Sequence, residues 1–391
     1  MERRDTGYYD FLGDALNGMT YQEFVDTMLA DKQNGLKTPG FSWDAVLQTD
    51  FNYDQIEAEL GIKTMATYVD YDSPSPMKSV EGISLAKGSI PRMKQAFPVT
   101  EKMLRERAII YERTAGMSEA MRNAILRLMF STTEDLILGN YNSLTYQRDQ
   151  MVSTGKLTVT KENNPGGYDN ITFSASVPDD NRVTLSGDSR WFTDMNGTEG
   201  AKSDPVKDLK DLIRKAQDLG LRGFHFEVEK VTFEKTIAHS KVRQFIGWNR
   251  NPLASAEDAA AIGAYIDGEE AKRILERVLG VPIVVNDNVV SVESFNKTKK
   301  KLEKTQTVSF AENVWVLVPN GSLGTIKSVR PMRVGNFLSI GDTPNIAFFD
   351  GGRTILEYLV NDRTNTGVIT SELTALVVPD KPKYMFYLTV A

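Results

Sequence analysis

The chain has 391 residues, a hydrophobic share of 41% and a formal net charge of −6, the composition of a globular protein with roughly two or three domains or subdomains. It contains no cysteine, so disulfides, thiolate metal sites and cysteine nucleophiles are excluded. The acidic balance argues against a basic nucleic-acid-binding fold, and no apolar run approaches the roughly 20 residues of a membrane-spanning helix.

Residues 1–60 are expected to form an N-terminal arm of short amphipathic helical pieces. The first residues are not followed by an apolar core, so no signal peptide is expected. A capping box precedes an apolar stretch that begins at Phe24. A small apolar cluster follows around Phe41 and Trp43, and residues 53–60 are expected to add a helical turn or two. Such pieces cannot build a core alone, so they must lie against this chain or a neighbouring copy.

Residues 61–98 are expected to form a long, mostly polar β-hairpin. Residues 64–69 are a strand candidate, and two alternating stretches follow at 79–85 and 89–97. This segment carries four basic residues, Lys78, Lys87, Arg92 and Lys94. An isolated two-stranded hairpin is marginal in water and has exposed edges, so this one needs a partner surface.

The stretch from residue 98 to 160 is expected to be a helical spine. Six apolar residues recur in it at helical spacing: Met117, Met121, Ile125, Leu128, Met129 and Leu136. No proline interrupts the helix, although Gly116 and Gly139 are candidate kinks. The stretch is expected to end in a strand at residues 156–160.

An α/β unit is expected between residues 204 and 318, because helical and strand patterns alternate there. Two strands, 171–177 and 182–185, precede it, and Trp191 with Phe192 is expected to pack at its base. Inside the unit we expect a helix from Pro205 to Gly220, a strand at 224–228, a helix at 232–246, helical structure at 256–279 and strands at 281–285, 307–310 and 314–318. The last part of the chain is strand-rich, at 354–360, 368–378 and 383–390.

Candidate chemistry is sparse, and no catalytic, cofactor-binding or metal-binding residue is assigned. The basic run at residues 296–304 could touch phosphates, but a solvated loop at the tip of a lobe is the favoured interpretation. His225 is expected to be a satisfied structural histidine, and His239 to lie on a solvated helix face. Ordinary acidic loops account for four aspartates that could bind a cation, Asp179, Asp180, Asp188 and Asp194. None of the common hydrolase, nucleotide-binding or calcium-loop motifs is present.

The order of these parts resembles the major capsid proteins of tailed phages. An arm, an extended hairpin, a long helix, an α/β lobe and a β-rich return are the parts of the Hong Kong 97 fold. The sequence is most similar to the phage lambda major capsid family in three places: Met65-Ala-Thr-Tyr-Val69 with the polar hairpin and residues 91–98, the helix–strand–helix pattern of 204–245, and the closing strands from Ile369 to Ala391. The likeness spans nearly the whole chain from about residue 61.

The resemblance implies an α+β fold in five segments. They are the N-terminal arm (1–60), the extended loop (61–98), a peripheral domain with the spine helix (99–202), an axial α/β domain (203–352) and a return to the peripheral domain (353–391). It also implies a non-catalytic protein that forms the hexamers and pentamers of an icosahedral phage head around double-stranded DNA, assembled in the host cytoplasm, without a cofactor and without sequence-specific DNA binding.

Residues of the arm and the extended loop are then expected to contact neighbouring subunits: Phe24, Trp43, Lys78, Lys87, Arg92 and Lys94. Some relatives of this fold form covalent links through a lysine of the loop, but noncovalent pairing with an acidic patch is favoured here. The expected partners are other copies of the chain, a separate scaffolding protein, a portal and, as a further candidate, a decoration protein; no membrane is involved. Two alternatives stay open: a protein cage that encloses cargo, in the manner of encapsulins, and a soluble α/β enzyme with a pocket near 204–318.

Overall fold

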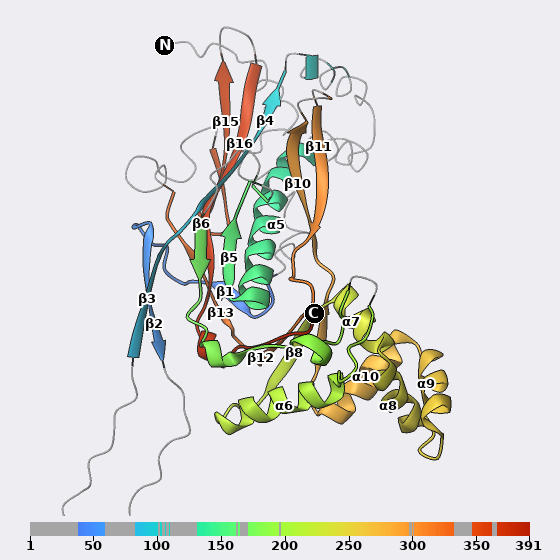
Figure 1. Ribbon diagram of the computed structural model, residues 1–391. Helices are drawn as coiled ribbons and strands as arrows, with labels where there is room; N and C mark the ends of the chain where they lie inside the picture. The colour runs from blue at the N-terminus through green and yellow to red at the C-terminus, as the bar shows by residue number, and fades with distance from the viewer. Residues whose placement is uncertain are drawn as a thin grey trace, which may run out of the picture.

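The computed structural model describes residues 38–58, 83–100, 131–161, 163–164, 171–194, 197–296, 299, 301–331, 346–361 and 366–391, with four single positions between 102 and 109. These residues form an elongated body (Figure 1). A large sheet and a long helix occupy one end, and an α/β lobe with most of the helices occupies the other. No described helix is both long and apolar enough to cross a bilayer.

The large sheet is built around one long strand near the end of the chain, β16 (Thr366–Pro379). Its outer half pairs with β15 (Thr354–Asn361) on one side and β4 (Arg92–Val99) on the other, both antiparallel. Its inner half pairs with β13 (Gly324–Ser328), which continues to β1 (Phe41–Trp43). β14 (Ile346–Phe349) completes the sheet beside β15. The expected strands 354–360 and 368–378 are confirmed.

The spine helix α5 (Ser131–Thr154) packs along this sheet. Its apolar side chains share a core with β13, β15 and β16: Leu136, Ile137, Tyr141, Leu144 and Val152. Gly139 does not interrupt the helix. The helix ends at Gly155, which has a φ of 71°, and the antiparallel strands β5 (Lys156–Val159) and β6 (Ile171–Ser174) follow. Of the six residues in the expected apolar stripe, Leu136 is buried and the other five lie outside the described residues.

The α/β lobe has a five-stranded sheet in the order β7-β17-β12-β8-β9. Its strands are β7 (Arg182–Thr184), β17 (Phe386–Thr389), β12 (Val314–Pro319), β8 (Phe224–Glu229) and β9 (Ile283–Asn286). Its helices are α6 (Pro205–Asp218), α7 (Lys230–Ala238), α8 (Ser240–Arg250), α9 (Ala256–Ala264) and α10 (Gly268–Leu279). Trp191 and Phe192 are buried in its core, as expected, and Trp191 contacts Trp315 edge-on at a centroid distance of 6.2 Å.

Helix α6 begins, ends and buries its apolar face at the residues that its sequence predicted. The Asp204 side chain accepts a hydrogen bond from the Lys207 amide, Pro205 occupies the first turn, and Gly220 follows the helix with a φ of 81°. The five residues expected on its apolar face, Val206, Leu209, Leu212, Ile213 and Ala216, are all buried. This helix therefore presents its opposite, charged side to solvent.

Two further pairs of antiparallel strands lie outside the two large sheets. The first, β10 (Val289–Asn296) with β11 (Lys301–Val308), runs beside α5 in Figure 1. The second, β2 (Asn52–Ala58) with β3 (Ile83–Ser89), forms a two-stranded sheet that leaves the body at one side. We call the second pair the ribbon. At its base, Tyr53 and Ile90 pack into a small core with Met151 and Leu157.

Several expectations for the first hundred residues were wrong. Residues 52–58 are strand, not helix, because pairing with β3 outweighs their helix propensity. Strands β3 and β4 do not pair with each other: the chain changes partner at Ile90 and Pro91, so that β3 joins β2 and β4 joins β16. The strand expected at 64–69 and the helical pieces before residue 38 lie outside the described residues.

The chain also passes between the large sheet and the α/β lobe more often than the five expected segments predicted. Strands β13 and β14 fall within 203–352 but belong to the large sheet, whereas β17, within 353–391, belongs to the α/β sheet. The helix expected at 232–246 is two helices, because His239 has extended backbone angles (φ −61°, ψ 135°) and caps the second one. Sheet pairing over long sequence distances decides these boundaries, and no local pattern carries that information.

Candidate assembly surfaces and the network behind them

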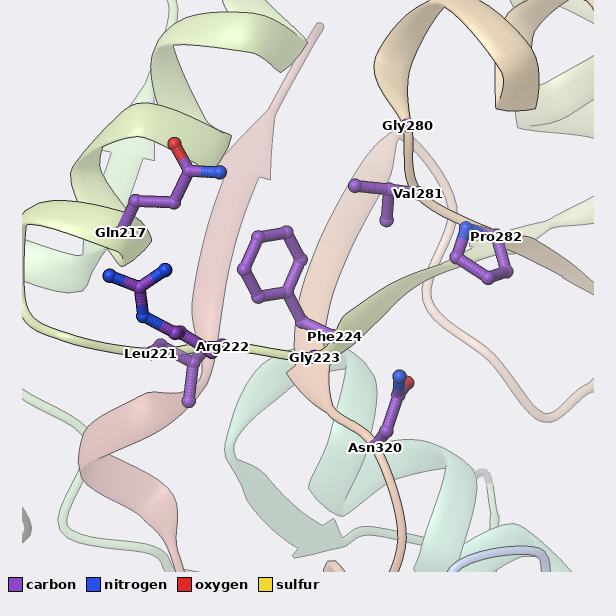
Figure 2. Close-up of a pocket in the computed structure, with 9 residues that line it drawn as sticks. All are labelled: Gln217, Leu221, Arg222, Gly223, Phe224, Gly280, Val281, Pro282 and Asn320. Carbon is purple, nitrogen blue, oxygen red and sulfur yellow. The ribbon is translucent and has the colours of Figure 1, made fainter.

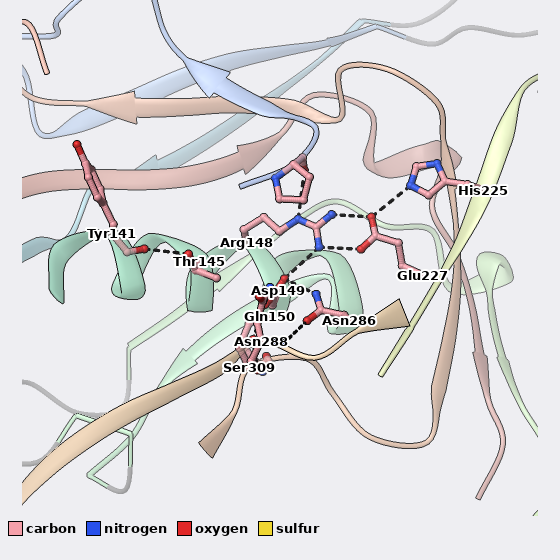
Figure 3. Close-up of polar contacts among 11 residues, drawn as sticks. Tyr141, Thr145, Arg148, Asp149, Gln150, His225, Glu227, Asn286, Asn288 and Ser309 are labelled. Carbon is pink, nitrogen blue, oxygen red and sulfur yellow. Dashed lines mark hydrogen bonds and ion pairs between the residues drawn. The ribbon is translucent and has the colours of Figure 1, made fainter. Parts of the chain in front are cut away.

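A buried network of charged side chains joins the spine helix to the α/β lobe (Figure 3). The guanidinium of Arg148 on α5 donates two hydrogen bonds to the carboxylate of Glu227 on β8, at N–O distances of 2.7 and 2.6 Å. It also donates to Asp149 at 3.0 Å and to the carbonyl of Pro39 at 3.3 Å. Both Arg148 and Glu227 are only 1% exposed. Three segments far apart in sequence therefore meet on one arginine.

Asp149 extends the network toward the hairpin β10–β11. Its carboxylate accepts hydrogen bonds from the side-chain amides of Asn286 and Asn288, at 2.9 and 3.0 Å, and from the hydroxyl of Ser309. The adjacent Gln150 donates to the carbonyl of Ser309 at 2.7 Å. A buried carboxylate needs such donors, because burial without them is costly. The network therefore fixes α5 to the end of β9 and to the base of the hairpin.

This network was not expected from the sequence, because charged residues in a helix are usually exposed. One signal was present. Residues 147–150, Gln-Arg-Asp-Gln, are four consecutive polar residues, and at 3.6 residues per turn they cover nearly the whole circumference of a helix. A helix packed on more than one side must then bury at least one of them. The partners, however, stand about 80 to 160 positions further along the chain, so the pattern could not identify them.

His225 is bound into the edge of this network. Its ring nitrogens lie 2.8 Å from the Asn320 side-chain oxygen and 3.4 Å from a carboxylate oxygen of Glu227. Burial lowers the pKa of His225, but hydrogen bonds to Glu227 and Asn320 outweigh it and raise the pKa above its ordinary value. Burial raises the pKa of Glu227. The positive charge of Arg148 and the hydrogen bonds that His225 and Arg148 donate outweigh this effect and bring the pKa of Glu227 below its ordinary value. This geometry fits the expected role of a satisfied structural histidine.

His239 does not lie on a solvated helix face, contrary to expectation. It is 2% exposed, and its Nε2 lies 2.8 Å from the hydroxyl of Ser203. Its Nδ1 accepts the backbone amide hydrogen of Lys241, so the ring proton is on Nε2 and is donated to Ser203. The Ser203 hydroxyl in turn donates to the carbonyl of Gly200 at 2.7 Å. In this arrangement the histidine cannot take a proton from the serine, so the pair is a structural contact and not a nucleophile with its base.

Of the four aspartates considered as cation ligands, one caps a local turn and the other three lie in short 3-10 turns. Asp194 accepts hydrogen bonds from the backbone amide and hydroxyl of Thr198, at 3.0 and 2.6 Å. Asp179 and Asp180 form one short 3-10 turn, and Asp188 lies in another. Within the described part of the chain, no three histidine, aspartate or glutamate side chains gather as metal ligands would.

The structure places four of the six expected subunit-contact residues. Phe24 and Lys78 lie outside the described residues. Trp43 packs partly buried against the core of its own subunit, with the guanidinium of Arg353 5.2 Å from its ring centre, and its contact with a neighbouring copy stays a prediction. Lys87 lies on β3 of the ribbon, opposite Asp54 in the strand register.

Arg92 and Lys94 lie together on β4. Both approach Glu372 of β16 within the same subunit, Lys94 at 3.6 Å and Arg92 more closely. Their side chains are still more than half exposed, at 55% and 52%. A single carboxylate faces two cations here, so a positive surface remains beside the base of the ribbon. Surface pairs of this kind contribute little to folding and can still direct association.

The basic run at residues 296–304 lies at the tip of the hairpin β10–β11. In the described part of this tip, Lys299 pairs with Glu303 at 2.8 Å and Lys304 pairs with Glu293 at 3.2 Å. Two of its lysines are thus partly neutralised by neighbouring acids. This arrangement agrees with the expected solvated tip.

A cleft of about 510 Å³ opens at one edge of the α/β lobe (Figure 2). It lies between the end of α6, the start of β8 and the turn after α10. Figure 2 shows the ring of Phe224 standing between Gln217 and Val281, with the exposed Arg222 at the rim. Both helices point their C-terminal ends toward this edge. The cleft has room for an aromatic or aliphatic side chain.

Comparison with known proteins agrees with the architecture. A family model described as phage major capsid protein E matches residues 38–329. A solved prophage protein of Escherichia coli CFT073 assigned as a capsid protein is 12% identical with a TM-score of 0.50, and the match covers 95% of this chain and 99% of that one. A phage-related protein of Bordetella bronchiseptica RB50 is 12% identical with a TM-score of 0.48, covering 94% and 96%.

A capsid protein of cyanophage P-SCSP1u is 11% identical with a TM-score of 0.44, covering 90% and 86%. No curated protein sequence matches the chain. The prophage structure supports the α+β Hong Kong 97 fold of phage capsids, and the family model covers well over half of the chain. The chain therefore belongs to the phage major capsid protein E family and is a structural major capsid protein of the phage virion.

Proposed function

We propose that this capsid protein forms hexamers and pentamers, and that they close into an icosahedral shell around double-stranded DNA. In this proposal the ribbon of each copy lies on a neighbouring copy. One observation carries it: within the described sheets, β2 and β3 pair only with each other, and the ribbon leaves the body (Figure 1). A two-stranded sheet gains little stability alone, so a surface on another copy would stabilise it.

The segments of the chain then take the following roles in the proposal. The large sheet with α5 is the peripheral domain, the α/β lobe is the axial domain around the centre of each capsomer, and residues 1–37 contribute an arm. Lys78, Lys87, Arg92 and Lys94 contact an acidic surface of the next subunit, and Phe24 anchors the arm. The shell forms in the host cytoplasm, with a separate scaffolding protein, a portal and a candidate decoration protein as partners.

DNA is enclosed without sequence-specific contacts, and the protein catalyses no reaction. The net charge of −6 supports this role, since a basic protein would condense the phosphates directly. The two histidines also support it: both hold positions inside hydrogen-bond networks, where neither has the geometry of a general base.

The test is assembly of the purified protein and of two variants. In the first variant a two-residue turn replaces residues 55–86, which removes the outer ribbon and keeps Tyr53 and Gly88 at its base. In the second, residues 1–37 are deleted, and the cut stops before β1 because Phe41 belongs to the core. We expect particles from the full chain by light scattering and electron microscopy, and folded protein without closed shells from each variant.

Particles of normal size from the ribbon variant would contradict the role proposed for the ribbon. A full chain that stays monomeric together with its scaffolding protein would contradict assembly itself. The contents of the particles separate a phage head from a cargo cage: nucleic acid absorbs at 260 nm, whereas enclosed enzyme does not add that signal.

A further inference from the structure

The α/β lobe carries an acidic, apolar surface at one end. We call it the tip and define it as residues 251–270, the turn after α8, helix α9 and the start of α10. It contains five acids and no lysine or arginine: Glu257, Asp258, Asp267, Glu269 and Glu270. Two large side chains protrude from it, Leu253 at 96% exposure and Tyr265 at 93%. Both line one shallow hollow on this surface, and exposed apolar groups that cluster in this way mark a candidate interaction surface.

The opposite end of the lobe carries a basic surface. We call it the α6 face and define it as Lys207, Lys210, Arg214 and Arg222. The three α6 residues are spaced by three and four positions and are all exposed, so they form one stripe along the helix. Arg222 continues the stripe to the rim of the cleft. Two exposed acids, Asp211 and Asp218, lie at the same helical spacing, and Asp211 pairs with Arg214 at 3.3 Å. Four bases against these two acids leave the stripe a positive excess.

We propose that the tip of one copy docks on the α6 face of the next copy around the capsomer, with Tyr265 or Leu253 entering the cleft beside Phe224. This inference rests on the proposed function, since the partner is a second copy of this chain. Figure 1 places α6 and α9 at opposite ends of the lobe. A contact between two different surfaces at opposite ends repeats from copy to copy and closes into a ring.

The distribution of charge favours contact between the tip of one copy and the α6 face of the next over a two-fold contact between two tips. Glu270 pairs with Arg250 within its own copy, and the other four acids of the tip give it a negative excess. Two tips face to face would bring two acidic surfaces together, and like charges across an interface cost several kcal/mol. Tip against α6 face pairs acids with bases. In the described structure, Glu257 and Glu269 on the tip form no ion pair, and neither do Lys207 and Arg222 on the other face. Their charges are therefore available for partners on the next copy.

The cleft suits the protruding side chains of the tip. Most of its accessible lining is polar, Phe224 and Val281 lie nearly buried at its floor, and its rim carries Arg222. A tyrosine ring in such a site buries apolar area and places its face near a guanidinium, which is a favourable arrangement. A single aromatic anchor in a pocket, surrounded by a charged rim, is the usual composition of an interface hot spot.

The first experiment changes the sign of charged residues on each of the two surfaces. E257K/E269K exchanges two of the five acids of the tip for lysine, K207E/R222E exchanges two of the four bases of the α6 face for glutamate, and the fourfold variant carries both exchanges. Each double variant should lower the particle yield at least about tenfold relative to the full chain, and the fourfold variant should recover part of it, because opposite charges again face each other at the exchanged positions. K230E is the matched control: Lys230 is exposed on α7, outside both surfaces, and this variant should assemble normally. Far-ultraviolet circular dichroism checks that each variant is folded.

The second experiment cross-links pairs of introduced cysteines, which are the only thiols because the chain contains no cysteine of its own. A bismaleimide cross-linker applied to particles of Y265C/Q217C should give a ladder of covalent species that ends at the hexamer, whereas each single variant should stay monomeric. Dimers from Y265C alone would show tip-to-tip contact and overturn the proposal. If the full chain forms particles while the charge variants and K230E behave alike, this inference fails and the capsid proposal stands. If the full chain forms no particles even together with its scaffolding protein, the proposal of a closed shell itself fails.

Discussion

Arg148 and Glu227 form a two-pronged ion pair in which both side chains are almost fully removed from water. The pair lies where the spine helix meets the first long strand of the α/β lobe (Figure 3). Planar, bidentate geometry of this kind is the strongest that a guanidinium and a carboxylate can adopt. Because both charges lost their hydration on folding, each depends on the other. The position of the lobe on the spine therefore depends in part on this pair.

We expect Glu227→Gln to lower the free energy of unfolding by about 3–5 kcal/mol, because it leaves the Arg148 charge buried without its main partner. Replacing both residues by apolar ones of similar size, as in Arg148→Met with Glu227→Leu, should cost clearly less than the single change. Urea denaturation of the unassembled protein at one fixed concentration measures both values, since assembly would couple stability to concentration.

The exposed pair Arg214–Asp211 provides the control. Arg214→Ala should change the free energy of unfolding by less than about 1 kcal/mol, because both partners are solvated. Equal effects of Glu227→Gln and Arg214→Ala would show that the buried pair does not hold the two ends of the molecule together.

Local patterns predicted one part of this structure well and another part poorly. Helix α6 was predictable, because its cap, its first-turn proline and its apolar stripe are all set by residues within one segment. The pairing of β4 with β16 joins residues 268 to 282 positions apart, and no pattern in residues 92–99 specifies that partner. The network around Arg148 was missed for the same reason. The candidate contacts Arg92 and Lys94 were identified from their charge alone, and their shared partner Glu372 became visible only in the structure.

The two histidines should make the stability of the protein depend on pH in opposite directions. His225 has a raised pKa, so its contribution is fully present below the unfolded value of about 6.5 and is lost as the pH rises through the folded pKa. Burial lowers the pKa of His239, while Glu199 opposes the shift. Its contribution is therefore present above about 6.5 and is lost as the pH falls through the folded pKa.

Since the chain has only these two histidines, single variants separate the effects. Thermal melting between about pH 5.5 and 8 should show that His225→Asn removes a loss of stability toward high pH, and that His239→Asn removes a loss toward low pH. Asn320 and Glu227 face His225, and Ser203 and Glu199 face His239, so the substitutions leave these partners in place. Two variants that shift the profile in the same direction would contradict the assignment.

Helices α8 and α9 pack so closely that glycine is required at the contact. A Cβ atom at Gly247 would lie 1.9 Å from the carbonyl oxygen of Ala259, and one at Gly263 would lie 2.1 Å from that of Arg243. Gly247→Ala should therefore push the two helices apart and lower the free energy of unfolding by about 1–3 kcal/mol or more. It should also lower particle yield, because α9 carries the tip.

Gly268 at the start of α10 is the matched control for that change. The nearest atom to a Cβ there is a side-chain carbon of Ile237 at 3.7 Å, an ordinary contact distance. Gly268→Ala should be neutral or slightly stabilising, since alanine restricts the unfolded chain more than glycine does. Chemical denaturation of both variants measures the difference, and a Gly247→Ala protein as stable as Gly268→Ala would show that the close contact is not required.

The base of the ribbon offers a way to disturb its direction without changing its charge. Gly88 lies opposite Tyr53 in the strand register, and a Cβ at Gly88 would come within 2.5 Å of the tyrosine ring. That ring is buried against Ile90 and Met151, so it cannot move aside without opening the small core at the base. Gly88→Val should therefore turn or detach the ribbon at a cost of about 1–3 kcal/mol.

Assembly should respond to this change more strongly than folding does, because a displaced ribbon misses its surface on every neighbouring copy. We expect few or no closed shells from Gly88→Val by electron microscopy, together with a circular dichroism spectrum close to that of the full chain. Gly88→Val combined with Tyr53→Ala makes room for the valine and should restore part of the particle yield. If Gly88→Val assembles normally, the direction of the ribbon does not determine assembly. If the double variant recovers nothing, the contact with Tyr53 is not the cause of the defect.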